Sequence, residues 1–596
     1  MRKILSAAAL LLFLIIAASA QTPKLKYTVN LKDLDGDLFN VTLDISGLHS
    51  QNDLFQFAST APGTYQVMDI GRFVRDFKAF DKKGNEIAVK RLSDNQFQFS
   101  NPKKIRKIVY RIAETWDTPV DKNVVYKMCG SSIENDNVLI NGQCVFGYPK
   151  GMQSEPMEIK LAYPDTWDIG TALSKNKEGN YHADNYDQIV DSPILLGRLT
   201  KASTTLGKAS VEIYTYSKTG LIKSEDLLKS MENMLRAADA FLGGLPVDRY
   251  TFLFHFEDQS AGAWEHSYSS EYVMTEQPYS EEYGKTIKGI AAHEFFHVVT
   301  PLNIHSDIIE PFNFVTPVPS EHLWLYEGTT EWASDIMQLR YGLLDLDGFL
   351  NEQTKKLGYS HHYDTTYSLS KLALTSYSEQ GQRQYGNIYL RGAIVAGLLD
   401  IRLLELSNGK KGLREVIREL SKQYGPHRAF PEKEFFQIFT SMTYPEIADF
   451  FNHYVKNADP LPIASYYAKL GIRYTSEIKS GEAVSSIGAQ FYASEGKIRI
   501  TDLRDELKAF GLIEDDEVTA INAAPMNLSN AKQILKDLRE QPIGSDYTIV
   551  VKRPEGEVKV KSKILVKEES RQFVFEVDPQ ATEKQVALRN AWMKNL

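Results

Sequence analysis

Alternating apolar and polar positions mark the first third of the chain as rich in β-strands. Apolar residues occupy every second position over residues 25–31 and again over 39–45. Shorter runs at 107–112 and 157–162 repeat the pattern, and segments rich in Gly, Asn, Asp and Pro separate the runs. These runs predict a β-sandwich-like N-terminal domain over residues 21–205.

From residue 206 the hydrophobic positions follow a helical period instead. An apolar run at 250–256 predicts one strand among these helices. The most regular helical patterns cover residues 224–242, 323–341 and 386–406. We therefore expect a mainly helical second domain over residues 206–478, and the whole chain to be a multidomain α+β protein.

The first twenty residues have the pattern of a signal peptide. Arg2 and Lys3 precede an apolar run at residues 4–17, and the small residues Ala18-Ser19-Ala20 suit a cleavage site. The run is too short to span a membrane, and no later stretch is apolar enough to do so. We expect an exported, soluble protein, periplasmic or secreted, that begins at Gln21.

Net charge and cysteine content limit the classes of function. The formal charge is 68 − 77 = −9, or 66 − 77 = −11 without Arg2 and Lys3, which argues against nucleic acid as a partner. Only Cys129 and Cys144 are present. They either form a disulfide, worth roughly 3 kcal/mol, or remain buried free thiols. Two thiols do not make a cysteine zinc site.

A His-Glu-x-x-His motif provides the strongest chemical signal. On a helix, His293 and His297 lie on one face about a turn apart, so both imidazoles can reach one metal ion. Glu294 is offset from that face, where it can take a proton from a water on the metal without ligating it. The apolar surroundings of the motif make a chance match improbable.

Glu327 and Glu331 complete the predicted metal site. A catalytic zinc takes three protein ligands and leaves one position open for water, and Glu327 is the third ligand that we expect. Glu331 lies one helical turn further and can accept the second N–H of a ligand histidine. The sequence therefore predicts one zinc ion per chain. His305 and His322 lie nearby, and we expect solvent-facing or structural roles for both.

These residues resemble the glycyl aminopeptidase family of gluzincin zinc metallopeptidases, which carries a C-terminal PDZ domain. The resemblance rests on His293-Glu294-x-x-His297 and on Trp324-Leu325-x-Glu327-Gly328. It implies a thermolysin-like catalytic domain and removal of small N-terminal residues, Gly and Ala, from peptides with a free N-terminus. The basic segment that often follows the motif in the family is absent at residues 298–305.

The segment after the predicted strand resembles the glycine-rich edge strand of these aminopeptidases, G-x-x-E-[NH]. Here it reads Gly262-Ala263-Trp264-Glu265-His266. The resemblance implies that Glu265 binds the α-amine of the substrate, and Gly262 permits close approach of a substrate strand. The alternative is a surface carboxylate in a loop.

Tyr389 and an N-terminal segment extend the resemblance. Tyr389-Leu390-Arg391-Gly392-Ala393 is similar to the family's Y-x-[KR]-G-A segment, whose tyrosine donates a hydrogen bond to the oxyanion, with Tyr385 as the second choice. Residues 61–65 and 72–74 are similar to the family's P-G-S-Y and R-x-V segment. For Pro62-Gly63, a purely structural turn is the alternative.

Residues 479–570 are expected to form a PDZ domain. Residues 511–522 are similar to the PDZ segment G-L-x-x-G-D-x-[IV]-x-x-[IV]-N, with Asp515 in place of the second glycine, and a short helix is predicted at 529–539. Such a domain binds a peptide by adding it as a strand to a sheet edge. Residues 571–596 are left as a C-terminal tail.

Together these observations predict an exported zinc aminopeptidase. A zinc endopeptidase of the same fold would share the metal chemistry but lack a working amine anchor, so Glu265 discriminates between the two. A PDZ-centred peptide-binding protein with little catalysis would tolerate the loss of site residues, and the intact motif with Glu327 argues against it.

Overall fold

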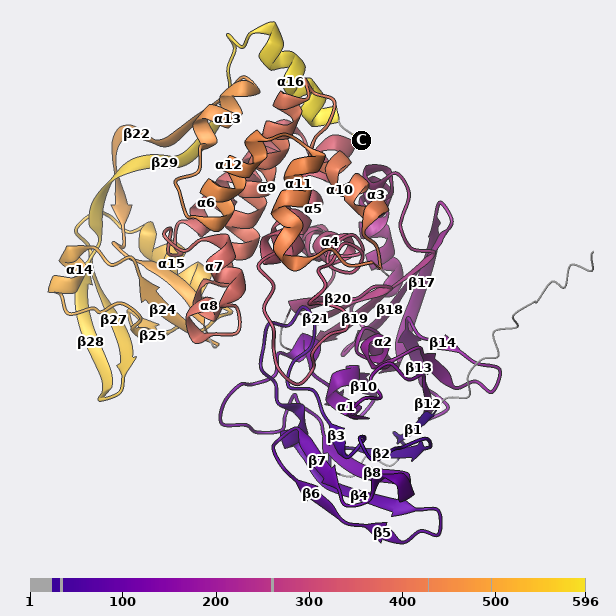
Figure 1. The fold of residues 1–596 in the computed structure, drawn as a ribbon. Coiled ribbons are helices and arrows are strands. Elements are labelled where there is room, and N and C mark those ends of the chain that lie inside the picture. Colours follow the sequence, from indigo (N-terminus) through magenta and orange to yellow (C-terminus); the bar gives the residue numbers. More distant parts are fainter. Residues whose placement is uncertain (1–23, 33–35, 259–261, 427, 495, 595) are drawn as a thin grey trace, which may run out of the picture. The chain divides into compact units, whose positions relative to one another are not determined.

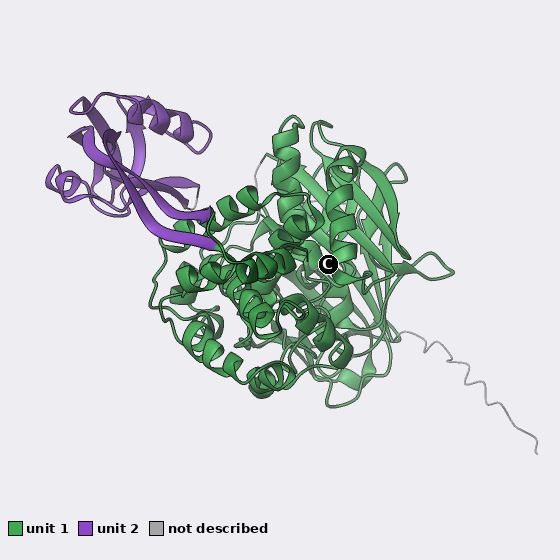
Figure 2. Ribbon diagram, turned by 90° about the horizontal axis from the view of Figure 1, so that it is seen from above, with its two compact units in different colours: residues 1–471, 579–596 green, residues 472–578 purple. Residues whose placement is uncertain are grey.

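The computed structural model describes residues 24–32, 36–258, 262–426, 428–494, 496–594 and 596. The signal peptide predicted at residues 1–20 lies outside this described part. The chain divides into two compact units, residues 1–471 with 579–596, and residues 472–578 (Figure 2). Within the described residues, no helix has the length and apolar character needed to cross a bilayer.

Three sheets make up the N-terminal region, which confirms that it is rich in β-structure (Figure 1). The largest has the strand order β14 (Ser174–Lys175), β15 (Tyr181–Ala183), β12 (Met157–Ala162), β1 (Leu25–Asn30), β2 (Leu38–Ile45), β8 (Ile105–Ala113), β4 (Val74–Asp81) and β5 (Glu86–Ile87). A second has the order β13 (Asp168–Thr171), β16 (Ile194–Gly197), β10 (Asn137–Ile140) and β9 (Ser132–Ile133). The third has the order β11 (Tyr148–Pro149), β3 (Leu54–Gln56), β7 (Gln96–Phe99) and β6 (Val89–Arg91).

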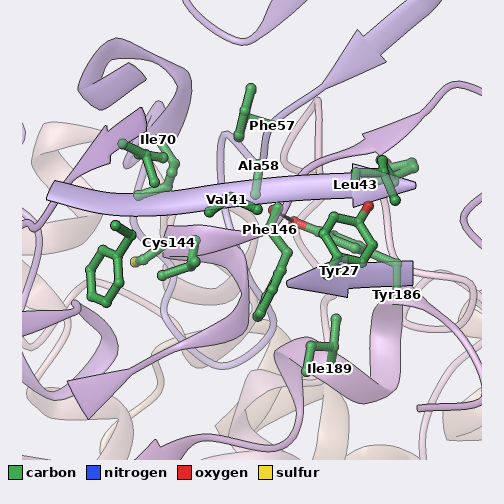
Figure 3. Packing of buried hydrophobic residues seen from close by; sticks show 14 of the residues in the cluster. Tyr27, Val41, Leu43, Phe57, Ala58, Ile70, Cys144, Phe146, Tyr186 and Ile189 are labelled. Atoms are coloured by element: carbon green, nitrogen blue, oxygen red, sulfur yellow. Dashed lines mark hydrogen bonds between the residues drawn. The ribbon is translucent and has the colours of Figure 1, made fainter. Parts of the chain in front are cut away.

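Aromatic side chains fill the core between these sheets and the short helices α1 (Gly142–Val145) and α2 (Tyr186–Val190) (Figure 3). Tyr27 packs edge-on against Phe146 with ring centroids 5.2 Å apart, and the Tyr186 hydroxyl donates to the Phe146 carbonyl at 2.9 Å. Cys144 lies in the same core. It and Cys129 are both buried free thiols, so the disulfide alternative does not hold in this structure.

A five-stranded sheet begins the second region of the first unit. Its strand order is β17 (Leu199–Leu206), β18 (Ala209–Ser217), β19 (Arg249–Glu257), β21 (Ser269–Thr275) and β20 (Gly262–Glu265). β18, β19 and β21 are parallel, whereas β20 runs antiparallel to β21 at the edge of the sheet. β17 starts before the predicted boundary at 205/206 because its eight residues pair with β18 and not with the N-terminal sheets.

Helices α3 (Ser224–Leu242) and α4 (Glu281–Phe296) pack against this sheet (Figure 1). The Ser280 side chain caps α4 by accepting a hydrogen bond from Tyr283 N at 3.1 Å. The other helical elements include η4 (Trp324–Gly328, a π-turn), α5 (Thr329–Tyr341), α6 (Leu346–Ser360), α7 (Leu369–Leu374), α8 (Glu379–Gln384), α9 (Asn387–Leu406), α10 (Leu413–Gln423), α11 (Phe435–Met442), α12 (Glu446–Phe451) and α13 (Ile463–Lys469). The strand and the helices predicted in this region are thereby confirmed.

Two glycines allow η4 and α9 to approach each other closely. A Cβ on Gly328 would lie 2.7 Å from the Cα atom of Gly392, a distance that side-chain carbons do not tolerate. The contact therefore requires glycine at both positions. It fixes the turn that carries Glu327 against the helix that carries Tyr389.

The end of the chain returns to the first unit. Residues 571–596, predicted as a tail, contain the last residues of β29 (Leu565–Val577) and helix α16 (Glu583–Lys594). Trp592 on α16 is only 1% exposed, and its carbonyl accepts a hydrogen bond from Arg340 Nε on α5 at 2.9 Å. The helix is ordered because it buries this aromatic side chain.

The second unit, Ile472–Asp578, is wider at both ends than the predicted 479–570, because a long two-stranded ribbon enters and leaves it. The ribbon pairs β22 (Ile472–Ser486) with β29 (Leu565–Val577). The sheet has the order β23 (Gln490–Ser494), β24 (Lys497–Thr501), β25 (Glu517–Ile521), β27 (Asp546–Arg553) and β28 (Gly556–Lys563), with β26 (Ala524–Pro525) paired to β25. Helices α14 (Asp505–Ala509) and α15 (Ala531–Arg539) complete it, and α15 confirms the predicted helix. Its assignment as a PDZ domain stays a prediction.

Candidate active site

The two motif histidines come from the C-terminal end of α4. His293 lies in the last turn and His297 is the C-cap residue, so the helical spacing continues through the motif. Their Nε2 atoms lie 3.2 Å apart. His293 is 8% exposed and His297 is 1% exposed, so both imidazoles are buried.

Glu327 completes a triangle of metal-ligating atoms. It lies in the π-turn η4, and its Oε2 atom is 3.4 Å from His293 Nε2 and 3.5 Å from His297 Nε2. A tetrahedral ion with bonds of about 2.1 Å holds its ligand atoms about 3.4 Å apart. The three side chains therefore fit one metal ion without rearrangement.

Glu331 orients His293 from the first turn of α5. Its Oε2 atom lies 2.8 Å from His293 Nδ1, which leaves Nε2 directed at the metal position. Lys356 on α6 binds the other oxygen of Glu331 and lies 3.2 Å from Asp335 Oδ2. Burial raises the pKa of Glu331, but Lys356 and His293 outweigh it and hold that pKa well below its usual range. The sequence predicted Glu331, whereas it contained no signal for Lys356.

His297 is oriented by the backbone instead of a carboxylate. Its Nδ1 lies 2.9 Å from the carbonyl oxygen of Thr300, just beyond the end of α4. A neutral imidazole that donates from Nδ1 presents its Nε2 lone pair to a metal. No side-chain pattern in the sequence could reveal this partner, because any residue type supplies a carbonyl.

Glu294 lies beside the metal position and outside the ligand triangle. It forms a second close group with Glu265 and His297, whose ligating atoms are all within 4.8 Å of one another. Burial raises the pKa of Glu294, while His293 and His297 act in the opposite direction. A carboxylate under these opposed influences is suited to accept and return a proton.

Glu265 ends the edge strand β20, close to His297. The residue is 8% exposed, and burial raises its pKa to about 8. His297 opposes this rise in pKa, whereas the carboxylates of Glu327 and Glu294 add to it. Gly262 begins the same strand with φ of 113°, a conformation that favours glycine. In the described chain β20 pairs only with β21, so its other edge is free to bind an extended peptide.

Tyr389 and Tyr385 both lie beside the site. The Tyr389 ring centroid is 5.4 Å from that of His293 and 5.8 Å from that of Tyr385. Burial, and then the nearby carboxylate of Glu327, raise the pKa of Tyr389 well above its usual value. Its phenol therefore keeps its proton at neutral pH and can donate a hydrogen bond.

Residues 61–65 of the N-terminal region also reach this site. The Pro62 carbonyl accepts a hydrogen bond from Trp264 Nε1 at 3.1 Å, and Gly63 lies against Glu265. The resemblance of this segment to a family motif was the only signal, and it gave no position in space. By contrast, His305 and His322 are buried in hydrogen bonds to Asn303 O and Glu432 O, and neither joins a candidate metal group among the described residues.

Comparison with known proteins agrees with this geometry. Residues 26–198 match the family model of the Peptidase M61 N-terminal domain, and residues 286–395 match that of the M61 glycyl aminopeptidase. No curated protein sequence matches significantly. The crystal structure of an aminopeptidase N family protein from Idiomarina loihiensis has a TM-score of 0.78 at 20% identity, covering 96% of this chain and all of that one. Yeast LTA4 hydrolase gives a TM-score of 0.46 at 12% identity, over 75% of this chain and 70% of that one.

The second family match contains the His-Glu-x-x-His motif, the π-turn with Glu327 and Tyr389, whereas Glu265 lies before it. The structural likeness to the Idiomarina protein establishes the fold of the chain. Two regions of the chain thus match the models of the Peptidase M61 N-terminal domain and of the M61 glycyl aminopeptidase, and the chain is a hydrolase of the metallopeptidase class.

Proposed function

We propose that this protein is an exported, zinc-dependent aminopeptidase that removes N-terminal glycine and alanine from peptides. One observation carries the proposal. The Glu265 carboxylate, at the end of an edge strand, lies within 4.8 Å of ligating atoms of His297 and Glu294.

This short distance favours cleavage after the first residue. In any amino acid the amine nitrogen lies about 2.5 Å from the carbonyl carbon of the same residue. An ammonium bound to Glu265 therefore brings its own carbonyl group to Glu294 and His297, and not the carbonyl of a residue further along the peptide. An endopeptidase has no use for a buried carboxylate at this position.

The side chains around the metal divide the reaction between them. Zinc bound by His293, His297 and Glu327 would supply a Lewis acid and lower the pKa of a bound water to about 7. Glu294 takes the proton of the attacking water and returns it to the leaving amine. Tyr389 donates a hydrogen bond to the oxygen that gains negative charge, and Glu265 holds the α-ammonium in place.

The charge of the site favours two cationic ligands. Glu265, Glu294 and Glu327 are each at most 8% exposed, and buried carboxylates are costly unless cations compensate them. A metal dication and a substrate ammonium supply that compensation. Two histidines and one carboxylate in a tetrahedral arrangement are the donor set of catalytic zinc sites.

The enclosed position of the amine anchor supports the preference for glycine and alanine. Glu265 and Tyr65 are each 8% exposed, so little room surrounds the position of the first residue. We further propose a thermolysin-like catalytic domain on the sheet β17–β21, a PDZ domain within Ile472–Asp578 that binds a peptide, and export directed by residues 1–20. The charged and apolar order of those twenty residues supports export.

The test compares Glu265→Gln with the wild type on a glycyl peptide and on its N-acetylated form. A charge-assisted hydrogen bond in a buried site is worth about 1.5–3 kcal/mol, so kcat/KM on the free peptide should fall about ten- to hundredfold. The acetylated peptide carries no ammonium and should be a poor substrate of both proteins. Glu212→Gln on β18, whose carboxylate pairs with Lys201 at 2.7 Å, is the matched control.

A chelator should abolish activity and added zinc should restore it. Equal wild-type rates on free and acetylated peptides would show that the amine is not recognised, and a zinc endopeptidase would replace the aminopeptidase. Absence of hydrolysis of either peptide by the zinc-loaded protein would reject both and favour a peptide-binding protein.

A further inference from the structure

The 61–65 loop, Ala61 to Tyr65, brings the N-terminal domain directly onto the amine anchor. A Cβ on Gly63 would lie 2.3 Å from Glu265 Oε1 and 2.9 Å from Trp264 Nε1, so the loop backbone touches the carboxylate itself. Trp264 Nε1 donates to the Pro62 carbonyl at 3.1 Å and fixes the loop to β20. The loop is thus one wall of the space around Glu265.

Tyr65 ends this loop in a strained and firmly held conformation. Its φ of 45° lies in the left-handed region, which a bulky residue adopts only where the surroundings impose it. Its carbonyl accepts a hydrogen bond from Gln382 Nε2 at 2.8 Å, and Gln382 lies on α8, just before Tyr385. The Tyr65 ring centroid lies 5.6 Å from that of Tyr385 and 6.0 Å from that of Tyr377.

We infer that Tyr65 determines substrate specificity by filling the space that the side chain of the first substrate residue would otherwise enter. The inference rests on the proposed aminopeptidase function. That residue would lie between the amine anchor and the metal ligands, because its amine binds Glu265 and its carbonyl is attacked beside His297 and Glu294. Tyr65 flanks this interval from the N-terminal domain.

The electrostatic surroundings of Tyr65 agree with this position. Burial is the largest cause that raises the pKa of its phenol, followed by Tyr385 and by the carboxylates of Glu327 and Glu265. Glu327 is a metal ligand and Glu265 is the amine anchor. These influences agree with the place that the loop contact with Glu265 and the ring contact with Tyr385 give to Tyr65.

The experiment measures kcat/KM on glycyl-, alanyl- and leucyl-p-nitroanilide for the wild type, Tyr65→Gly and Tyr65→Phe. Glycine removes the ring and also suits the left-handed backbone, which limits the loss of stability. Tyr65→Phe keeps the volume of the ring and is the matched control. Melting temperature and zinc content show that each variant is folded and loaded.

We expect the leucyl-to-glycyl ratio of kcat/KM to rise at least tenfold in Tyr65→Gly, the scale of selection by pocket size, and to stay unchanged in Tyr65→Phe. An unchanged ratio in folded, zinc-loaded Tyr65→Gly overturns the inference and leaves the proposed function intact. If Tyr65→Gly does not fold, Tyr65→Asn, which also tolerates a left-handed backbone, decides by the same ratio. A wild type that hydrolyses none of the three substrates rejects the proposed function and the inference together.

Discussion

Glu331→Gln measures how strongly the surrounding protein supports the metal site. The substitution keeps the shape of the side chain but removes the charge that faces His293 Nδ1 at 2.8 Å. It also leaves Lys356 with Asp335 as its remaining anionic partner in this group. The three metal ligands themselves are unchanged, so any effect passes through the orientation and basicity of His293.

The structure limits the size of the effect from both sides. Loss of a partner that orients a ligand histidine typically costs 10–100-fold in metal affinity, which corresponds to about 1.4–2.8 kcal/mol. Two features favour a loss of affinity near tenfold: the Glu331 side chain is 22% exposed, and the glutamine oxygen still accepts a hydrogen bond. One feature favours a loss near 100-fold, because the Lys356 side chain is only 11% exposed and loses one of its two carboxylate partners.

Competition with a chromogenic chelator gives the zinc dissociation constant directly. We expect it to rise 10–100-fold in Glu331→Gln, with a much smaller change in kcat at saturating zinc, since the reacting groups remain. Glu352→Gln on α6, whose exposed carboxylate pairs with Lys355 at 2.7 Å, is the control and should bind zinc as the wild type does. Zinc affinity unchanged in Glu331→Gln would refute the supporting role of this carboxylate.

Three further changes test other parts of the site. Glu294→Gln should retain zinc and lower kcat by about 10²–10⁴, and activity within tenfold of wild type excludes it as the general base. Tyr389→Phe should lower kcat by about 10²–10³ with little change in KM, and an equal loss in Tyr385→Phe alone would transfer the role to that residue. Deletion of residues 472–578 with the flanking segments joined should leave the zinc content unchanged, because every ligand lies in the other unit. Truncation after residue 471 should give a lower melting temperature than this internal deletion, because the truncation also removes α16 and the buried Trp592.

Local periodicity was sufficient to predict most elements and the two histidine ligands. The helix at 224–242 and the motif helix follow from spacing alone, because side chains three and four apart share a face. Glu327 was predicted because a catalytic zinc needs a third ligand and because its segment resembles the family motif, and the π-helical turn that carries it was not foreseen. The positions of Glu265 and Tyr389 came from resemblance, not from periodicity.

Contacts between distant segments could not be predicted in this way. Lys356 reaches Glu331 from another helix, and the Thr300 carbonyl reaches His297 without any side-chain signature. Tyr65 precedes Glu265 by 265 − 65 = 200 residues in the chain, so only the folded structure brings them together. The C-terminal helix was missed because it buries a single tryptophan, Trp592, and has no continuous apolar face that the sequence would reveal.

The position of Glu265 bears both on the peptide bond that is cleaved and on the protein wall that surrounds the site. A carboxylate so near the metal ligands brings the carbonyl of the first residue, and not that of a later one, to the site, which supports exopeptidase action. The same nearness places the anchor among buried anions, and burial with those anions raises its pKa to about 8. A protein wall that excludes water strengthens the attraction between this carboxylate and a substrate ammonium, because charges interact more strongly where the dielectric constant is low. The N-terminal domain supplies part of that wall through Gly63, so the proposed selection by Tyr65 and the proposed recognition of the amine by Glu265 depend on the same loop, residues 61–65.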